Sequence, residues 1–332
     1  MPVRGSRLDH LILLIAFPGL ILLALVVEKT ALAPRRAARP TEQDVEIWRS
    51  FAAQHPQFGA AQVRLADAEL KAGDRAAAIE AYQRALELAP DLQGAALGLS
   101  QLHRDAGDHR AAIAVLEPFV AKQTGCLECL QNLAADYLAL GDLERAASYI
   151  ERVTSSAVYL PSVSNSNFSF GRARLLAGRI DEARGQLDAA VDHYQAALRY
   201  DPRLVGAHLL LGHVLLARAP RAALAHLEAY RAANPGDLRG ALSLAEAYGD
   251  LGDEVAARRV LEEVRAGAAQ RPPAQRRQLD LDAETQLAAL EMRRGDLEAA
   301  RSRLEAVLAR DPGHAAARAQ LADVRQRLAA QP

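Results

Sequence analysis

A glycine followed by an aspartate recurs in this chain at a fixed interval, and this period constrains the fold more than any other feature. Gly73, Gly107 and Gly141 stand 34 residues apart, and each is followed by Asp. Gly252 and Gly295 continue the series and stand 43 residues apart, which is one period with nine additional residues. A period of this length is typical of solenoid proteins, in which each repeat stacks on its neighbours. The pattern therefore predicts an array of repeats with local insertions.

The residues around each Gly predict a pair of amphipathic helices. Apolar and small residues lie at steps of three, four and seven on both sides of the turn, which is the period of a helix. The Gly supplies the positive φ that ends the first helix, and Ala follows five residues later, as at Ala78 and Ala146. A small residue there lets the two helices cross closely, so a bulky replacement should overpack the crossing and cost about 1–3 kcal/mol.

On these residues the chain resembles the tetratricopeptide repeat family, whose 34-residue unit is a helix-turn-helix. The resemblance covers most of residues 59–330. It implies an all-α fold, a right-handed superhelical solenoid of about seven units whose first helices line a concave groove. The units are predicted at 59–92, 93–126, 127–160, 161–203, 204–237, 238–271 and 281–314.

Some segments depart from this pattern. The unit ending at Pro202 offers Gly178 or Gly185 as its turn, so its extra residues lengthen either its second helix or its first. In the following unit, Ala219 and Pro220 replace the Gly-Asp turn. We predict irregular inserts near 154–170 and 266–278 within a solenoid spanning 59–314, a capping helix at 42–56 and a C-terminal capping helix at 315–330.

The N-terminal segment predicts a membrane anchor. Leu11 to Val27 is a run of seventeen residues without a charge, and at about 1.5 Å per residue it forms a helix of about 25 Å, close to the thickness of a bilayer core of about 30 Å. A cleaved secretory signal is the alternative, because Ala31-Leu32-Ala33 fits a cleavage motif that would start the mature chain at Pro34. The Pro at that position and the length of the run favour an uncleaved anchor. The predicted segments are a basic tail at 1–10, a transmembrane helix at 11–27 and a linker at 28–41.

This layout predicts a single-pass protein of a bacterial-type inner membrane. Lys29, Arg35, Arg36 and Arg39 follow the apolar run, whereas Arg4 and Arg7 precede it. Positive residues concentrate on the cytoplasmic side of membrane proteins, so the larger number of positive residues after the run weakly favours a cytoplasmic location for the repeats. The opposite orientation, with the short basic N-terminus in the cytoplasm, fits nearly as well, so the sequence does not decide on which side of the membrane the repeats lie.

Composition and motifs give no catalytic, metal or cofactor site. The chain has 40 Lys plus Arg against 41 Asp plus Glu and a net charge of -1, so nucleic acid is not an expected partner. Cys126 and Cys129 form a C-x-x-C without a second pair, which excludes a four-Cys zinc site, and Leu130 excludes covalent haem. The spacing of the His residues makes ligation by His208, His213 and His226 improbable. We expect no enzyme, no cofactor and no small-molecule substrate.

The resemblance also implies which side chains face the concave groove. In the family, the second, fifth, ninth and twelfth positions of each first helix point to that side. The resulting mixture of apolar and polar groups suits an extended or helical peptide of a protein partner. The candidate partner-binding residues are Val63, Asp67, Leu70, Leu97, Gln101, Arg104, Gln131, Leu138, Leu209, His213, Leu216, Leu242, Glu246, Gln286 and Met292.

The sequence therefore predicts a membrane-tethered scaffold or assembly factor that binds a peptide or helix of a partner protein. One alternative is a redox-active or enzyme-associated protein that uses Cys126 and Cys129, because a helix N-terminus activates a thiol. The repeat context instead favours Cys129 as a packing residue and Cys126 as a loop residue. The other alternative is a secreted soluble scaffold formed after signal cleavage.

Overall fold

The computed structural model describes residues 42–155 and 164–330, with side chains from Phe170 onward in the second range. In these ranges all regular secondary structure is α-helical, so the expected all-α fold is confirmed there. The helices are α3 (Glu42–Gln54), α4 (Gly59–Ala72), α5 (Arg75–Leu88), α6 (Gln93–Asp105), α7 (His109–Lys122), α8 (Leu127–Ala139), α9 (Leu143–Ser155), α10 (Ser164–Ala183), α11 (Leu187–Tyr200), α12 (Val205–Leu216), α13 (Pro220–Ala233), α14 (Leu238–Asp250), α15 (Glu254–Ala268), α16 (Pro273–Arg294), α17 (Leu297–Arg310) and α18 (Ala315–Ala329).

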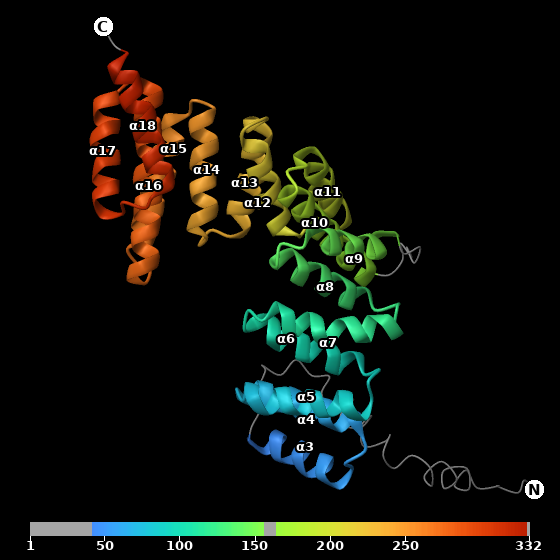
Figure 1. Cartoon of the computed structure of the whole chain (residues 1–332). Helices are drawn as coiled ribbons and strands as arrows, with labels where there is room; N and C mark the ends of the chain where they lie inside the picture. The colour runs from blue at the N-terminus through green and yellow to red at the C-terminus, as the bar shows by residue number, and fades with distance from the viewer. Residues whose placement is uncertain (1–41, 156–163, 331–332) are drawn as a thin grey trace, which may run out of the picture. The chain divides into compact units, whose positions relative to one another are not determined.

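The chain divides into two compact units, residues 1–95 and residues 96–332. In the described part of the first unit, α3 packs on α4 and α4 packs on α5. Arg49 of α3 donates to Glu69 of α4 over 2.7 Å. In the second unit, successive helices pair as hairpins, which Figure 1 shows for α14 with α15 and for α16 with α17.

Five turns within the hairpins follow the predicted Gly-Asp pattern, and a sixth has Gly185 followed by Gln186, which makes no side-chain cap. The Gly residues have φ between 77° and 95°, the left-handed region in which any other residue is strained. The Asp that follows caps the second helix; Asp74 Oδ1, for example, accepts from the amide of Ala77 over 2.9 Å. The left-handed residues are Gly73, Gly107, Gly141, Gly185, Gly252 and Gly295.

The Ala five residues after each turn glycine lies at the crossing of the two helices. All six of these Ala side chains have no solvent-exposed surface, as expected for a position where the backbones approach closely. They are Ala78, Ala112, Ala146, Ala190, Ala257 and Ala300. Ala223 is equally buried in the hairpin whose second helix begins with Pro220. Pro is well suited to the first turn of a helix, because a backbone amide at that position makes no hydrogen bond within the helix.

The structure distinguishes the two candidate turns of the long repeat. Gly185 has a φ of 77° and ends the turn, whereas Gly178 lies inside α10. A Cβ at position 178 would lie 2.5 Å from Cε1 of Tyr194 on α11, so Gly178 is required by close helix packing. The extra residues therefore lengthen the first helix of this repeat, which has 20 residues.

The segment 266–278, expected as an irregular insert, is largely helical. It comprises the end of α15 at Ala268 and the start of α16 at Pro273, so only residues 269–272 lie between helices. Pro273 occupies the first helical position, and the Ala, Gln, Arg and Leu residues after it favour helix. The additional residues extend α16 to 22 residues instead of forming a loop. Of the other expected insert, 156–163 lies outside the described residues, while 164–170 belongs to α10.

The predicted basic tail at 1–10, transmembrane helix at 11–27 and linker at 28–41 lie outside the described residues. Among the helices from α3 to α18, none combines the length and the apolar content that crossing a lipid bilayer requires. The membrane anchor therefore stays a prediction.

Candidate functional site

Several first helices of the second unit contact one another directly, and we call the side that they present the first-helix surface. Helix α8 contacts α10, α12 contacts α14, and α16 contacts both α14 and α18. Each second helix from α7 to α17 contacts the first helix that follows it. The predicted groove residues lie on the first helices. Some of their polar side chains are hydrogen-bonded to other residues of the chain, and others are not.

In the first unit, three predicted residues lie on α4. Val63 is half-buried, Leu70 is partly exposed, and Asp67 accepts a hydrogen bond from the hydroxyl of Tyr82 over 2.5 Å. Asp67 therefore already serves the packing of its own hairpin.

The five predicted residues on α6 and α8 include two whose polar groups bind neighbouring side chains. Gln101 donates to Asp105 over 2.6 Å and accepts from Arg104 over 2.8 Å. Leu97 and Leu138 are half-buried, and Gln131 is buried at 8% exposure. These two helices thus offer a partner few unsatisfied polar groups.

Arg104 binds a buried carboxylate. Its Nε and Nη2 atoms each lie 2.8 Å from the Asp136 carboxylate on α8, and Asp136 has no exposed surface. Nδ1 of His109 lies 2.9 Å from Oδ1 of the same Asp136. Because an unpaired buried charge is costly, Arg104 and His109 hold α6, α7 and α8 together here.

The predicted residues on α12 lie beside the core of the next hairpin. Leu209 and Leu216 pack against the apolar cluster formed mainly by α14, α15 and α16. Nε2 of His213 lies 2.6 Å from Oγ of Ser243 on α14. Met292, by contrast, packs against the cluster of α16, α17 and α18.

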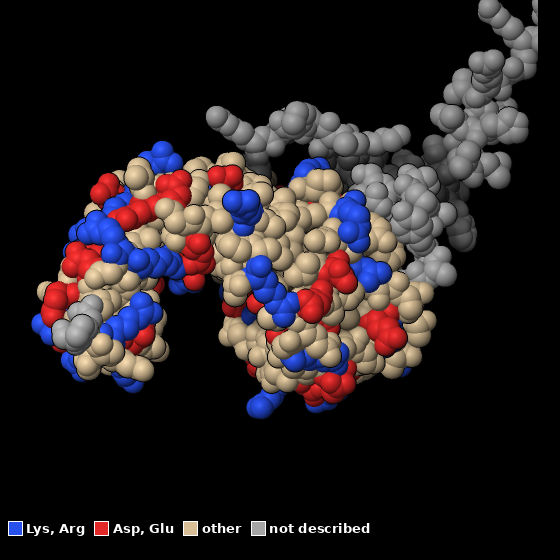
Figure 2. Space-filling view, turned by 90° about the horizontal axis from the view of Figure 1, so that it is seen from above, with Lys and Arg blue, Asp and Glu red and all other residues tan. Residues whose placement is uncertain are grey.

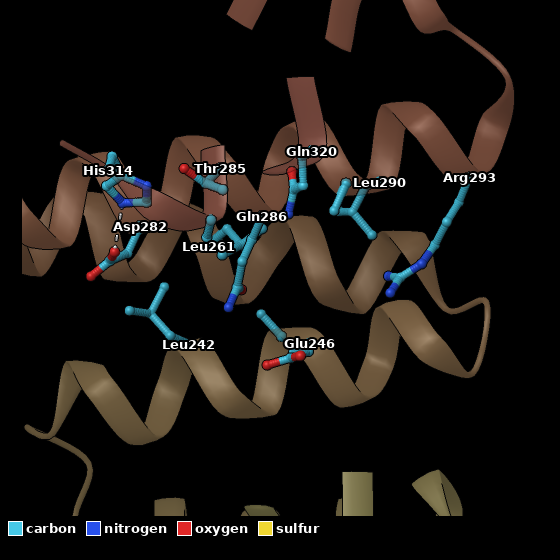
Figure 3. Close-up of a pocket in the computed structure, with 13 residues that line it drawn as sticks. Leu242, Glu246, Leu261, Asp282, Thr285, Gln286, Leu290, Arg293, His314 and Gln320 are labelled. Atoms are coloured by element: carbon cyan, nitrogen blue, oxygen red, sulfur yellow. Dashed lines mark hydrogen bonds and ion pairs between the residues drawn. The ribbon is translucent and has the colours of Figure 1, made fainter. Parts of the chain in front are cut away.

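Leu242, Glu246 and Gln286 line one pocket, which we call the α14–α18 pocket (Figure 3). Its volume is about 310 Å³. In Figure 3, Gln286 extends from α16 towards the space between Leu242 and Glu246 on α14. The residues lining the pocket are Leu242, Ala245, Glu246, Leu261, Asp282, Thr285, Gln286, Ala289, Leu290, Arg293, His314, Ala316 and Gln320.

Two side-chain amides in this pocket each have a buried oxygen without a partner. Oε1 of Gln286 and Oε1 of Gln320 are both buried and accept no hydrogen bond. Gln320 lies 34 residues after Gln286, so the two occupy equivalent positions on successive first helices. A buried acceptor without a donor costs about 1–3 kcal/mol, and most buried polar groups in folded proteins avoid this cost.

Glu246 is the pocket carboxylate without an ion pair. Among the described residues, none forms a hydrogen bond or a salt bridge with it. The residue is exposed to solvent, but neighbouring protein atoms desolvate its carboxyl in part, and this raises the pKa of the Glu246 carboxyl. Asp250 raises that pKa further, and Arg293 opposes the rise. Arg293 itself is paired with Asp250.

His314 is also in the pocket, but both of its ring nitrogens have partners. Nδ1 accepts from the amide of Ala317 over 3.2 Å and so caps α18. This assigns the ring proton to Nε2, which lies 3.1 Å from Oδ1 of Asp282. His314 therefore joins α18 to α16 and leaves no ring nitrogen for a ligand.

Several pocket residues were not among the predicted groove residues. Thr285 and Ala289 stand ten and six residues before Gly295, as Leu242 and Glu246 stand before Gly252. Counting back from each turn glycine would therefore have found both. Gln320 would have followed from the 34-residue period, but α18 was treated only as a cap. Arg293 and His314 reach the pocket from helix ends, where the frame gives no guidance.

The two cysteines form a disulfide at the start of α8. Cys126 and Cys129 have Cα atoms 5.3 Å apart, and Cys126 occupies the N-cap. Their exposed fractions are 6% and 0%, so both sulfurs are shielded. Thiol–disulfide exchange requires access to a sulfur, and the geometry therefore favours a structural bond over a redox-active one.

The charges on one face of the molecule and the positions of the histidines bear on the expectations for nucleic-acid and metal binding. Figure 2 shows Lys and Arg side chains intermingled with Asp and Glu on the face that it presents. Nδ1 of His208 and Nδ1 of His226 lie 3.0 Å apart, but no group of three or more metal-ligating side chains is present within 42–155 and 164–330.

The stacked hairpins and their turns define an α-helical repeat protein. Family models described as tetratricopeptide repeat match residues 69–118, and residues 132–190 and 285–327, and a model described as TPR repeat matches 178–217. The repeats therefore belong to the tetratricopeptide repeat family, which generally mediates protein–protein interactions.

The chain is similar to proteins of diverse description. A human protein described as protein O-mannosyl-transferase TMTC1 is 26% identical over 137 residues, which make up 41% of this chain and only 15% of the human protein. A solved structure of PilF from Pseudomonas aeruginosa has a TM-score of 0.55 and 15% identity, with 64% of this chain and 92% of that chain covered. PilW, described as a type IV pilus biogenesis factor, has a TM-score of 0.56 and 16% identity, with 64% and 94% covered. The two solved structures show the fold alone.

Proposed function

We propose that this protein is a scaffold that binds a peptide segment of a partner protein on the first-helix surface, while its N-terminal apolar segment tethers it to a membrane. The observation that carries the binding part is the α14–α18 pocket, where Gln286 and Gln320 have buried oxygens without a partner and the solvent-exposed Glu246 carboxylate has no ion pair. Polar groups that the fold leaves without partners, beside apolar walls, are typical of a recognition site.

A blocking substitution tests this proposal. Ala289 lines the pocket from α16, so Ala289→Lys should fill the pocket without removing a core side chain. Ala306 is exposed on α17, and Ala306→Lys is the matched control. Membranes containing each protein are crosslinked, and the attached partners are quantified by mass spectrometry. We expect the control to retain the partners of the wild type and Ala289→Lys to lose them. Equal recovery with both variants would reject binding at this pocket.

The tether rests on the apolar run from Leu11 to Val27. Deleting residues 1–41 should release the protein from the membrane fraction, since the described helices carry no span of their own. The mass of the mature protein tests the secreted alternative, because cleavage would start the chain near Pro34.

The compartment is proposed from the cysteines. Disulfides persist in oxidising compartments and are rare in the cytosol. The Cys126–Cys129 bond therefore favours repeats on the extracytoplasmic side, opposite to the lean given by the charges that follow the apolar run. Labelling of denatured protein with a thiol reagent, with and without reduction, measures this. Two free thiols in unreduced protein would reject the extracytoplasmic side.

A further inference from the structure

Three polar side chains of the α14–α18 pocket can act as hydrogen-bond acceptors. The Glu246 carboxylate accepts hydrogen bonds and carries a charge without an ion pair. The amides of Gln286 and Gln320 each present one end to the pocket and bury the other without a partner. Either amide orientation leaves an unpaired buried end, so rotation about χ3 to present the oxygen costs little. The pocket can thus offer three acceptors from three different helices.

The charges near the pocket favour a cation over an anion. Arg293 is the one Lys or Arg in the lining, and it is neutralised by its pair with Asp250. Asp282 accepts from Gln278 over 3.0 Å and lies 3.1 Å from Nε2 of His314. Glu246 then remains as the lining carboxylate without a hydrogen-bond donor or an ion pair. An anionic ligand would be repelled by it and would have to displace Asp250 from Arg293.

The walls and the size of the pocket suit one long side chain. Leu242, Leu261 and Leu290 supply apolar surface, on which the methylene stem of a Lys or Arg packs while its head reaches polar groups. A volume of about 310 Å³ is at the lower limit of pockets that hold a whole small molecule, which span about 300–1,000 Å³. Arg presents five N–H donors in a plane, more than the three that Lys offers, and so it can serve several acceptors at once.

We propose that the α14–α18 pocket receives an arginine side chain of the partner peptide, with the guanidinium between the Glu246 carboxylate and the side-chain oxygens of Gln286 and Gln320. This assignment rests on the proposed function, since it names the chemistry that the same surface recognises. The guanidinium supplies hydrogen-bond donors to the Gln286 and Gln320 oxygens, for which the fold provides none, and a cation to the unpaired Glu246 carboxylate.

Selection from a library of random displayed peptides provides the probe. The full chain is immobilised in detergent, and bound peptides are compared with those bound to Ala289→Lys. We expect peptides specific to the wild type to share an Arg. The best peptide is then synthesised with Arg and with citrulline, which has nearly the same shape and no charge. Affinities are measured for the wild type, Glu246→Gln and the exposed control Glu262→Gln on α15.

Comparing the Arg and citrulline peptides on these three proteins isolates the interaction between the peptide Arg and Glu246. For the wild type and Glu262→Gln, citrulline should weaken binding by about tenfold or more, the effect of one charge-assisted hydrogen-bonded pair. For Glu246→Gln the two peptides should differ by less than about threefold. A Lys version should bind more weakly than the Arg version, because it has fewer donors.

The outcomes separate this proposal from the scaffold function. If no peptide distinguishes the wild type from Ala289→Lys, peptide binding at the pocket is rejected, and the arginine assignment is rejected with it. If peptides are selected without a shared cation, or if Glu246→Gln keeps the full preference for Arg over citrulline, the arginine assignment alone is overturned. Selection of acidic peptides that depend on Arg293 would overturn it in the same way.

Discussion

The α6–α8 region and the α14–α18 pocket both carry polar side chains on first helices, but these side chains meet different surroundings. In α6–α8, the guanidinium of Arg104 is bound by the buried Asp136, and Gln101 is bound by its own neighbours. In the α14–α18 pocket, Glu246 has no ion pair, and Gln286 and Gln320 have buried oxygens without donors. The same face of a repeat can therefore stabilise the array in one region and remain available to a partner in another.

Replacing Arg104 with Ala should give the largest loss of stability. The change leaves the Asp136 carboxylate buried with His109 as its remaining side-chain partner, and removing one member of a buried pair costs about 3–5 kcal/mol. Chemical denaturation measures the free energy of unfolding. Arg110→Ala, at an exposed position on α7, is the control and should change it by less than about 0.5 kcal/mol. A loss no greater than that of the control would contradict a structural role for Arg104.

Replacing both Gln286 and Gln320 with Leu should raise stability. The double variant removes two buried acceptors that lack donors, each costing about 1–3 kcal/mol, so a gain of about 1–2 kcal/mol is expected in denaturation. Gln101→Leu is the matched control, because that amide is already bonded to Asp105 and Arg104, and it should give no gain. A double variant less stable than the wild type would show that the two amides are hydrogen-bonded in the folded protein. The contrast drawn between the α14–α18 pocket and the α6–α8 region would then be rejected.

Replacing His314 with Ala should cost about 1 kcal/mol, the usual effect of losing a helix cap. His314→Asn should recover most of this loss, because Asn is a favoured N-cap residue. Thermal unfolding of the three proteins measures the difference. Equal destabilisation by Ala and Asn would indicate that the contact with Asp282, and not the cap, is the contribution of His314.

Replacing Glu246 with Gln should have the smallest effect on stability, with a size that depends on pH. The folded state raises the pKa of the Glu246 carboxyl, so it holds that proton more tightly than the unfolded state. Stability is therefore lost as the pH rises from the unfolded pKa through the folded one. Glu246→Gln should melt slightly higher than the wild type at neutral pH, and the difference should vanish near about pH 4. A lower melting temperature at neutral pH would show that the ionised carboxylate is stabilised by the fold.

Much of the fold follows from the sequence because its determinants are local. The turn glycines, the Asp caps and the small residues at the helix crossings all act within one hairpin, so a single 34-residue frame predicts them. The lengths of α10 and α16 could not be predicted from this frame. Gly178 fits a turn by its local sequence, and the side chain that requires it inside a helix, Tyr194, comes from the facing helix.

The pocket was predicted only in part, for a related reason. The frame places Leu242, Glu246 and Gln286 on first helices, but it does not tell whether their polar atoms find partners. Arg104 satisfies Asp136 from 32 residues away, and nothing in the spacing distinguishes it from Glu246, for which no such partner exists among the described residues. Whether a polar group finds a hydrogen-bond partner depends on its neighbours in three dimensions, which a one-dimensional pattern does not specify.

The six left-handed glycines provide a graded probe of local unfolding. A Cβ at each of these turns would meet no heavy atom within 4 Å, so Ala at any of them adds the same backbone strain and no steric clash. The intrinsic penalty is then equal along the chain, at about 1–2 kcal/mol. Differences among the six measured losses would therefore report how far each opening event spreads, and would map the cooperative segments of the array.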